Sequence, residues 1–260
     1  MSGLCDKGTT TQQRNSMNGN PALGVNYLVR GLKLITQPGL RVFVILPLLL
    51  NSIIFGFLIY LTIGQFSDWI QKAVDWLPSW LDFLAWVMWP LVVILMLTVV
   101  MYTFSIVANL IASPFNALLA EKTEELLTGQ EVLGSETIGQ AILSFPKSLT
   151  REVHKLVYYL PLALVALLIS LVLSPIAPFI WFLLGAWMMV IQYCDYPMDN
   201  HKKSFAVMKV SIKQQRLTSL GFGAVVMVGT MIPIVNFLIM PAAICGATAY
   251  WVDELKAQTP

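Results

Sequence analysis

Apolar residues gather in four long tracts along this chain, and the polar residues fall between the tracts. The first tract, Val42 to Ile63, contains no charged residue and would extend about 33 Å as an α-helix. That length is enough to cross the roughly 30 Å hydrocarbon core of a bilayer. The second tract, Phe83 to Ala112, is longer and carries Trp86 and Trp89, which suit a membrane interface. We therefore predict full transmembrane helices at about 42–63 and 83–112.

The other two tracts, Leu156 to Tyr193 and Leu217 to Val252, are each interrupted near the middle by proline. The breaks lie at Ser174 to Pro178 and at Ile232 to Asn236, so each tract predicts a helical hairpin. A short turn leaves roughly 17 residues per arm, about 25 Å, which falls short of a comfortable crossing. Two interpretations remain open: complete crossings, or partially penetrating hairpins whose broken backbone is shielded by protein. We favour the second.

Two amphipathic helices are expected at the membrane surface. Residues Pro21 to Ile35 place apolar side chains on one stripe with basic side chains beside it. Residues Pro114 to Leu127 form the second helix, with Ser113 as its N-cap and Gly129 just past its end. We expect a polar face on this second helix, made of Glu121, Lys122, Glu124 and Glu125.

The pattern as a whole predicts an all-α integral membrane protein. A single membrane domain, 21–254, would lie between a polar cytosolic tail, 1–20, and a short C-terminal tail, 255–260. Within the domain, residues 113–155 would form a cytosolic helical region between the second span and the first hairpin. The tail 1–20 has no apolar core of the kind found in signal peptides, so we expect no cleavable signal.

Composition and charge agree with a membrane protein and restrict its partners. Hydrophobic residues make up 57% of the chain and charged residues 12%, a balance that suits lipid as the solvent. The net charge of +2 and the lack of long basic runs argue against a nucleic-acid partner. The loop Gly64 to Asp82 is mainly acidic, whereas basic residues gather at the opposite ends of the tracts. We therefore expect a multi-pass protein with both termini in the cytosol.

The clearest candidate site is the turn between the first surface helix and the first span, at Gly39, Leu40 and Arg41. Pro38 and Gly39 end one helix, and the next would begin with free backbone N–H groups, which attract an oxyanion. Gly39 would let a ligand approach the backbone, and the Arg41 guanidinium can bind two oxygens at once. The alternative is an arginine that snorkels to the membrane surface after an ordinary turn.

A second group of polar residues, Asn109, Asn116, Glu121 and Lys122, runs from the second span into the next helix. Asn109 lies in or near the apolar zone, where an amide indicates a transport pathway or an interhelical hydrogen bond. Packing is the simpler explanation, and a solvated helix face explains Glu121 equally well. We expect neither a metal site nor a cofactor, because the two histidines lack metal-ligand spacing and the glycines form no nucleotide-binding motif.

Four blocks of the sequence are distinctive: QPGLRVFVILPLL (37–49), IASPFNALLAEKTEELLTG (111–129), AWMMVIQYCDYPMDNHK (186–202) and MIPIVNFLIMPAAICGATAYWVDE (231–254). In their order and spacing these blocks resemble those of the CysZ family of sulfate permeases. The resemblance implies sulfate uptake across the bacterial inner membrane for cysteine biosynthesis. It also implies a homo-oligomer with two spans and two partially penetrating hairpins, and a role for Gly39, Leu40 and Arg41 in sulfate binding.

Other classes of function fit less well. An intramembrane enzyme would need paired ionisable groups at membrane depth, and the charges lie at the ends of the tracts, so we expect no enzyme. A transporter of another small oxyanion is an alternative, since a helix N-terminus and an arginine would accept phosphate or sulfite almost as readily as sulfate. A non-transporting membrane scaffold is a further alternative.

Overall fold

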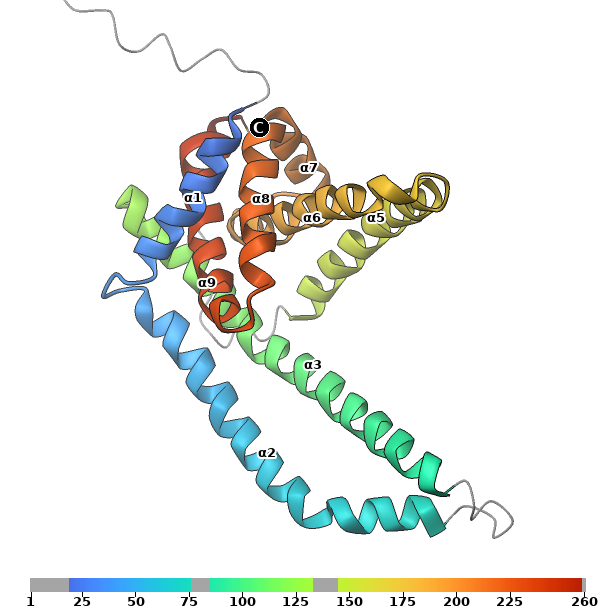
Figure 1. The fold of residues 1–260 in the computed structure, drawn as a ribbon. Coiled ribbons are helices and arrows are strands. Elements are labelled where there is room, and N and C mark those ends of the chain that lie inside the picture. Colours follow the sequence, from blue (N-terminus) through green and yellow to red (C-terminus); the bar gives the residue numbers. More distant parts are fainter. Residues whose placement is uncertain (1–18, 76–84, 133–144, 259–260) are drawn as a thin grey trace, which may run out of the picture. The chain divides into compact units, whose positions relative to one another are not determined.

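A computed structural model describes residues 19–75, 85–132 and 145–258 of the chain (Figure 1). Within those ranges the regular elements are all helical. The long helices are α1 (Pro21–Leu34), α2 (Arg41–Asp75), α3 (Ala85–Thr128), α5 (Phe145–Val172), α6 (Ala177–Asn200), α7 (Phe205–Gln214), α8 (Arg216–Thr230) and α9 (Pro233–Tyr250). The short ones are η2 (Ser174–Ile176), the π-helix η3 (Trp251–Leu255) and η4 (Lys256–Gln258).

This is an all-α membrane protein, as predicted. In the described residues, 4 stretches are long and apolar enough to cross a membrane: Arg41–Tyr60, Thr150–Val172, Ser174–Asn200 and Val235–Leu255. The chain divides into two compact units, one formed by residues 42–115 and the other by residues 1–41 together with 116–260. Each unit is considered by itself below.

In the unit 42–115, α2 contains the first predicted transmembrane helix, 42–63, and continues to Asp75. Large apolar side chains are exposed around this helix, among them Ile45, Ile53 and Phe57. A helix that is apolar on every side suits lipid rather than water. The loop expected to follow this span, 64–82, is thus helical as far as Asp75. Residues 76–84 lie outside the described part of the chain.

Helix α3 corrects the predicted boundary at Ser113. The span 83–112 and the surface helix Pro114–Leu127 were expected as separate elements, but one helix runs from Ala85 to Thr128 with Pro114 inside it. Proline removes one hydrogen bond from a helix, and here that loss does not end it. The predicted end is right, because Gly129 has a φ of 67° and its N–H donates to the Glu125 carbonyl at 2.8 Å.

In the other unit, α1 packs against α8 and α9 (Figure 1). Gly31 allows this close approach, since a side chain there would collide with the backbone of Ala242 and Gly246 on α9. The helix predicted at Pro21–Ile35 is thus confirmed, but its buried stripe faces protein rather than lipid. The opposite face, which includes Leu23 and Val29, is exposed.

The centre of this unit is formed by α6, α8 and α9. At Gly223 on α8 a side chain would collide with the backbone of Ala186 on α6, so the two helices touch through their main chains. The largest fully buried side chains include Trp251, Tyr250 and Phe222. This tightly packed core holds in place the helices that carry the polar groups of the candidate site.

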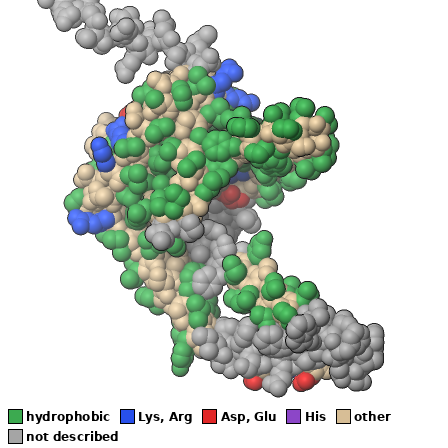
Figure 2. Space-filling model, viewed as in Figure 1, with side chains coloured by type: hydrophobic (Ala, Val, Ile, Leu, Met, Phe, Trp, Pro, Cys, Tyr) green, Lys and Arg blue, Asp and Glu red, His purple; other side chains and the backbone are tan. Residues whose placement is uncertain are grey.

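Helices α5 and α6 form the first predicted hairpin, and η2 provides the break at the predicted position. Figure 2 shows hydrophobic side chains covering this hairpin, and α5 exposes residues such as Val157, Leu164 and Val172. The arm-length estimate was too short here, because α5 has 28 residues and α6 has 24. Both helices extend beyond the apolar tract into its polar flanks, so helix length alone no longer argues against a complete crossing.

Helices α8 and α9 form the second predicted hairpin. α8 ends at Thr230 and α9 begins at Pro233, where proline occupies the first turn as its missing N–H allows. α8 has 15 residues, about 22 Å, so the length argument for partial penetration still applies to this arm.

Candidate functional site

The predicted site at Gly39, Leu40 and Arg41 forms a tight turn between α1 and α2. The N–H groups of Leu40 and Arg41 both donate to the carbonyl of Gln37, at 3.0 and 3.1 Å. Leu40 is 1% exposed, so its side chain anchors the turn in the core. Gly39 and Arg41 are both exposed on either side of this anchor.

The hydrogen bonds of this turn correct one part of the prediction. Free N–H groups were expected at all three positions, but those of Leu40 and Arg41 are already used by Gln37. Pro38 favours this outcome, because a proline in the second position of a turn sets up the hydrogen bond across it. Among the described residues the Gly39 N–H has no hydrogen-bond partner. An oxyanion would therefore meet one free N–H rather than three.

Two other features of the turn suit an anion. A Cβ built at Gly39 would have no heavy atom within 4 Å, so the backbone there is open to a ligand. The Arg41 side chain forms no ion pair with any residue in the described part of the chain. An exposed guanidinium without a carboxylate partner keeps its full charge and all its donors for an incoming oxyanion.

The second predicted group, on α3, is only partly brought together. Lys122 Nζ lies 2.6 Å from Glu125 and 3.7 Å from Glu121. The hydrogen bond to Glu125 raises the pKa of Lys122. Asn116 instead reaches α6, with its amide nitrogen 3.4 Å from the Tyr196 hydroxyl. Asn109 lies in α3, but its side chain is outside what the structure describes.

The polar face predicted for this part of α3 was wrong for two of its four residues. Glu121 is 6% exposed and Glu124 is 2% exposed. The carboxylate of Glu124 lies 2.8 Å from His201 Nε2 and 2.8 Å from Lys256 Nζ. His201, one of the two histidines without metal-ligand spacing, thus pairs with a buried carboxylate. The two partners offset the cost of burying the charge of Glu124.

The C-terminal segment Trp251–Leu255 also holds α1 in place through polar contacts. Glu254 accepts a hydrogen bond from the Tyr27 hydroxyl at 2.9 Å, and Asp253 lies 2.5 Å from Arg30. Burial raises the pKa of Tyr27, and the adjacent carboxylate of Glu254 raises it further. The segment is a π-helix, a form that is rare and often found at functional positions. It therefore fixes the helix that leads directly into the turn at 39–41.

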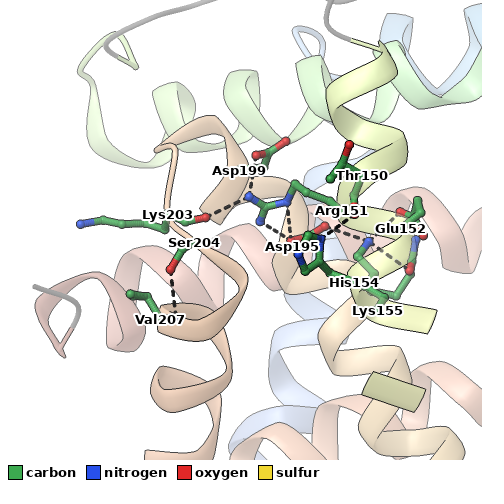
Figure 3. Close-up of polar contacts among 11 residues, drawn as sticks. Thr150, Arg151, Glu152, His154, Lys155, Asp195, Asp199, Lys203, Ser204 and Val207 are labelled. Atoms are coloured by element: carbon green, nitrogen blue, oxygen red, sulfur yellow. Dashed lines mark hydrogen bonds and ion pairs between the residues drawn. The ribbon is translucent and has the colours of Figure 1, made fainter. Parts of the chain in front are cut away.

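An ion-pair cluster joins α5 to α6, with Lys155 and Asp195 buried and Arg151 and Asp199 partly exposed (Figure 3). Asp195 lies between Arg151 and Lys155, with one carboxylate oxygen toward each (Figure 3). Lys155 Nζ lies 2.8 Å from Asp195, and Arg151 also pairs with Asp199 at 2.7 Å. In addition, Arg151 donates to the carbonyl of Lys203 at 2.9 Å. We name these four side chains, Arg151, Lys155, Asp195 and Asp199, the hairpin cluster.

The hairpin cluster was not predicted from the sequence, in which basic residues near the tracts were interpreted only as charges at the tract ends. Lys155 is 5% exposed and Asp195 is 7% exposed, so neither is a solvated surface charge. The one available signal was the i,i+4 spacing of two cations on one helix and two carboxylates on the other. No group of three metal-binding side chains occurs among the residues searched, which are those that the structure describes.

Comparison with known proteins agrees with the sequence resemblance. A model of the family described as "Sulfate transporter CysZ/Etoposide-induced protein 2.4" matches residues 27–241. A protein from Pectobacterium atrosepticum named "Sulfate transporter CysZ" is 45% identical over 236 residues, which is 90% of this chain and 86% of the relative. The chain belongs to this family. CysZ proteins of the same name from Pseudomonas fluorescens and Salmonella typhimurium are 45% and 44% identical, covering 90% and 92% of this chain and 95% of each relative.

The region matched by the CysZ family model includes the turn at 39–41 and the hairpin cluster. It ends before the π-helix that holds α1. The relatives are named as transporters rather than enzymes, in line with the expectation from the sequence.

Proposed function

We propose that this protein takes up sulfate across the bacterial inner membrane and thereby supplies sulfate assimilation and cysteine biosynthesis. Membership of the CysZ family and the names of its relatives support sulfate as the substrate. The observation that carries the proposal at the level of residues is the turn at 39–41, where an uncompensated guanidinium lies next to open glycine backbone. Sulfate, with four oxygens and two negative charges, matches those donors.

In this proposal each of the three residues Gly39, Leu40 and Arg41 contributes to sulfate binding in a different way. Arg41 supplies charge and two parallel N–H donors, and Gly39 supplies a free N–H and room for the anion. Leu40 contributes by anchoring the turn, since its side chain is buried. If the Gln37 hydrogen bonds open when the anion arrives, two further N–H groups become available. Asn109, Asn116, Glu121 and Lys122 are proposed to border the route from this site.

The proposed arrangement in the membrane follows the charge asymmetry of the chain. Both termini would lie in the cytosol, the protein would be multi-pass, and several copies would assemble as a homo-oligomer. The extensive exposed apolar surface of α5 suits burial in lipid or against another copy. Partially penetrating hairpins stay part of the proposal for α8 and α9 in particular, because α8 is short.

Flux of radiolabelled sulfate into proteoliposomes tests the function directly. Purified protein in vesicles with an imposed sulfate gradient should accumulate label faster than empty vesicles or vesicles containing Arg41→Ala. A sustained absence of flux in correctly folded protein would favour the alternative of a non-transporting scaffold. Competition with phosphate and sulfite in the same vesicles tests the alternative of another oxyanion. If either anion is taken up as well as sulfate, the protein is not specific for sulfate.

A further inference from the structure

The segment that links the two hairpins, residues 201–216, is unusual in its charge. It contains five basic residues and no acidic one, and the next carboxylate along the chain is Asp253. The five are Lys202, Lys203, Lys209, Lys213 and Arg216. Most of the segment is α7, which begins at Phe205. Its N-cap is Ser204, whose side chain accepts a hydrogen bond from the Val207 N–H.

Lys209 is held in place without being neutralised. Its ammonium lies 4.9 Å from the centre of the Tyr158 ring and 5.0 Å from the centre of the Phe205 ring. Tyr158 is itself fixed by a hydrogen bond of 3.2 Å from the indole N–H of Trp187. Aromatic faces attract a cation but do not cancel its charge. Among the described residues Lys209 has no carboxylate partner.

The exposed face of α7 combines charge with apolar surface. Lys213 lies one turn after Lys209, is exposed, and likewise has no ion-pair partner in the described part of the chain. Between them Val210 is 58% exposed, and Leu217 just beyond is 41% exposed. Lysines beside exposed aliphatic side chains on one short helix are typical of a helix that lies in the headgroup region of a bilayer.

The position of α7 in the chain places it at a membrane boundary. It follows α6, which is long and apolar enough to span, and precedes the apolar helix α8. The basic groups of the nearby hairpin cluster differ, since Arg151 and Lys155 are both paired with carboxylates and Lys155 is buried. Two sets of cations thus occur in the same fold: Arg151 and Lys155 have carboxylate partners, whereas Lys209 and Lys213 have none among the described residues.

We propose that α7 and its flanks bind the phosphate headgroups of anionic phospholipids. Lys209 and Lys213 donate to the phosphate oxygens, and Val210 contacts the upper part of the acyl chains. The cytosolic leaflet, where positive residues are expected to face, carries such lipids and attracts basic segments. The aromatic pair fixes the Lys209 ammonium beforehand, so less side-chain entropy is lost on binding.

Native mass spectrometry of the full-length protein in detergent tests this proposal with phosphatidylglycerol and phosphatidylcholine of equal chain length. The wild type should retain phosphatidylglycerol in preference to phosphatidylcholine. Lys209→Gln combined with Lys213→Gln should weaken that preference roughly thirty-fold, from the loss of two lysines near an anionic headgroup. The matched control is Lys72→Gln, which removes an exposed lysine from the end of α2. It should leave lipid retention unchanged.

Four further outcomes decide the interpretation. Lys209→Arg combined with Lys213→Arg should restore retention, and monodisperse gel filtration of every variant shows that folding is intact. Unchanged phosphatidylglycerol preference in the double glutamine variant would overturn the proposal. Inorganic phosphate at constant ionic strength should not displace the lipid at millimolar concentration, and if it does, the lysines bind a free oxyanion instead of a headgroup. The sulfate affinity of the double variant should equal that of the wild type, so this test is independent of the turn at 39–41.

Discussion

Arg41→Ala provides the sharpest test of the candidate anion site. The side chain is exposed and has no ion-pair partner among the described residues, so its removal breaks no interaction that holds the fold. The turn itself is maintained by the Gln37 carbonyl and the buried side chain of Leu40, which stay in the variant. A change in sulfate affinity would therefore report binding rather than stability.

The magnitude follows from the donors that are lost. Charge-assisted hydrogen bonds of roughly 1.5 to 3 kcal/mol in total correspond to about a ten- to hundredfold weaker affinity. Arg41→Lys should recover only part of this, because an ammonium keeps the charge but lacks the planar pair of donors that bind two oxygens at once. Because the Arg41 side chain is exposed, solvent and salt screen its charge. At physiological salt we therefore expect a loss of sulfate affinity toward the lower end of this range.

Gly39 allows a second test that removes no charge. Because no heavy atom lies within 4 Å of a Cβ at this position, Gly39→Ala meets no protein atom. Its φ is not in the positive range, so the added methyl group does not strain the turn either. Any loss of affinity in Gly39→Ala would come from a ligand that occupies the space.

The assay is sulfate titration of purified protein at fixed low salt, with folding checked by monodisperse gel filtration. Lys33→Ala serves as the control, since it removes an exposed positive charge from α1 just before the turn. It should lower affinity only slightly, through long-range attraction that salt screens. If well-folded Arg41→Ala binds sulfate as the wild type does, or if Lys33→Ala loses as much affinity, the turn is not a specific site. The search would then move to the polar residues of α3.

Three further predictions concern stability and topology. Asp195→Asn leaves the two cations of the hairpin cluster without their shared carboxylate and should lower the free energy of unfolding by about 3 to 5 kcal/mol, seen as an earlier thermal transition in detergent. Gly223→Ala forces α8 away from α6 and should cost about 1 to 3 kcal/mol in the same assay, whereas Gly56→Ala, which has open space around it, should be nearly neutral. A cysteine at Lys209 should react with impermeant reagents only from the cytosolic side, and one at Asp75 only from outside; the reverse result would refute the topology.

Local patterns predicted the parts of this fold that local physics determines. The apolar tract at 42–63 became a helix, and the prolines at 175 and 233 marked the breaks of the two hairpins. Each of these depends on the hydrophobic length of a segment or on the missing N–H of proline. A local rule failed at Pro114, where proline normally indicates a helix start and α3 instead continues.

The polar interior could not be predicted, because its partners lie far apart in the chain. Arg151 and Asp195 are separated by 44 positions, and Glu124 and His201 by 77. Each residue alone resembles an ordinary charge at the end of a membrane tract. Only the packing of α3, α5 and α6 brings the pairs together. The same packing shows which cations are paired with carboxylates, whereas Lys209 and Arg41 have no such partner among the described residues.

The hairpin cluster also bears on how deeply α5 and α6 enter the membrane. Helix length alone would allow a crossing, since the 28 residues of α5 extend about 42 Å. The charges of the cluster are costly at hydrocarbon depth even when paired, so the cluster belongs at or outside the boundary of the hydrocarbon core. Beyond Lys155, α5 has about 17 residues before it ends at Val172, roughly 25 Å, and α6 has a similar length before Asp195. Measured from the cluster rather than from the helix ends, both arms again fall short of a roughly 30 Å core, which supports partial penetration.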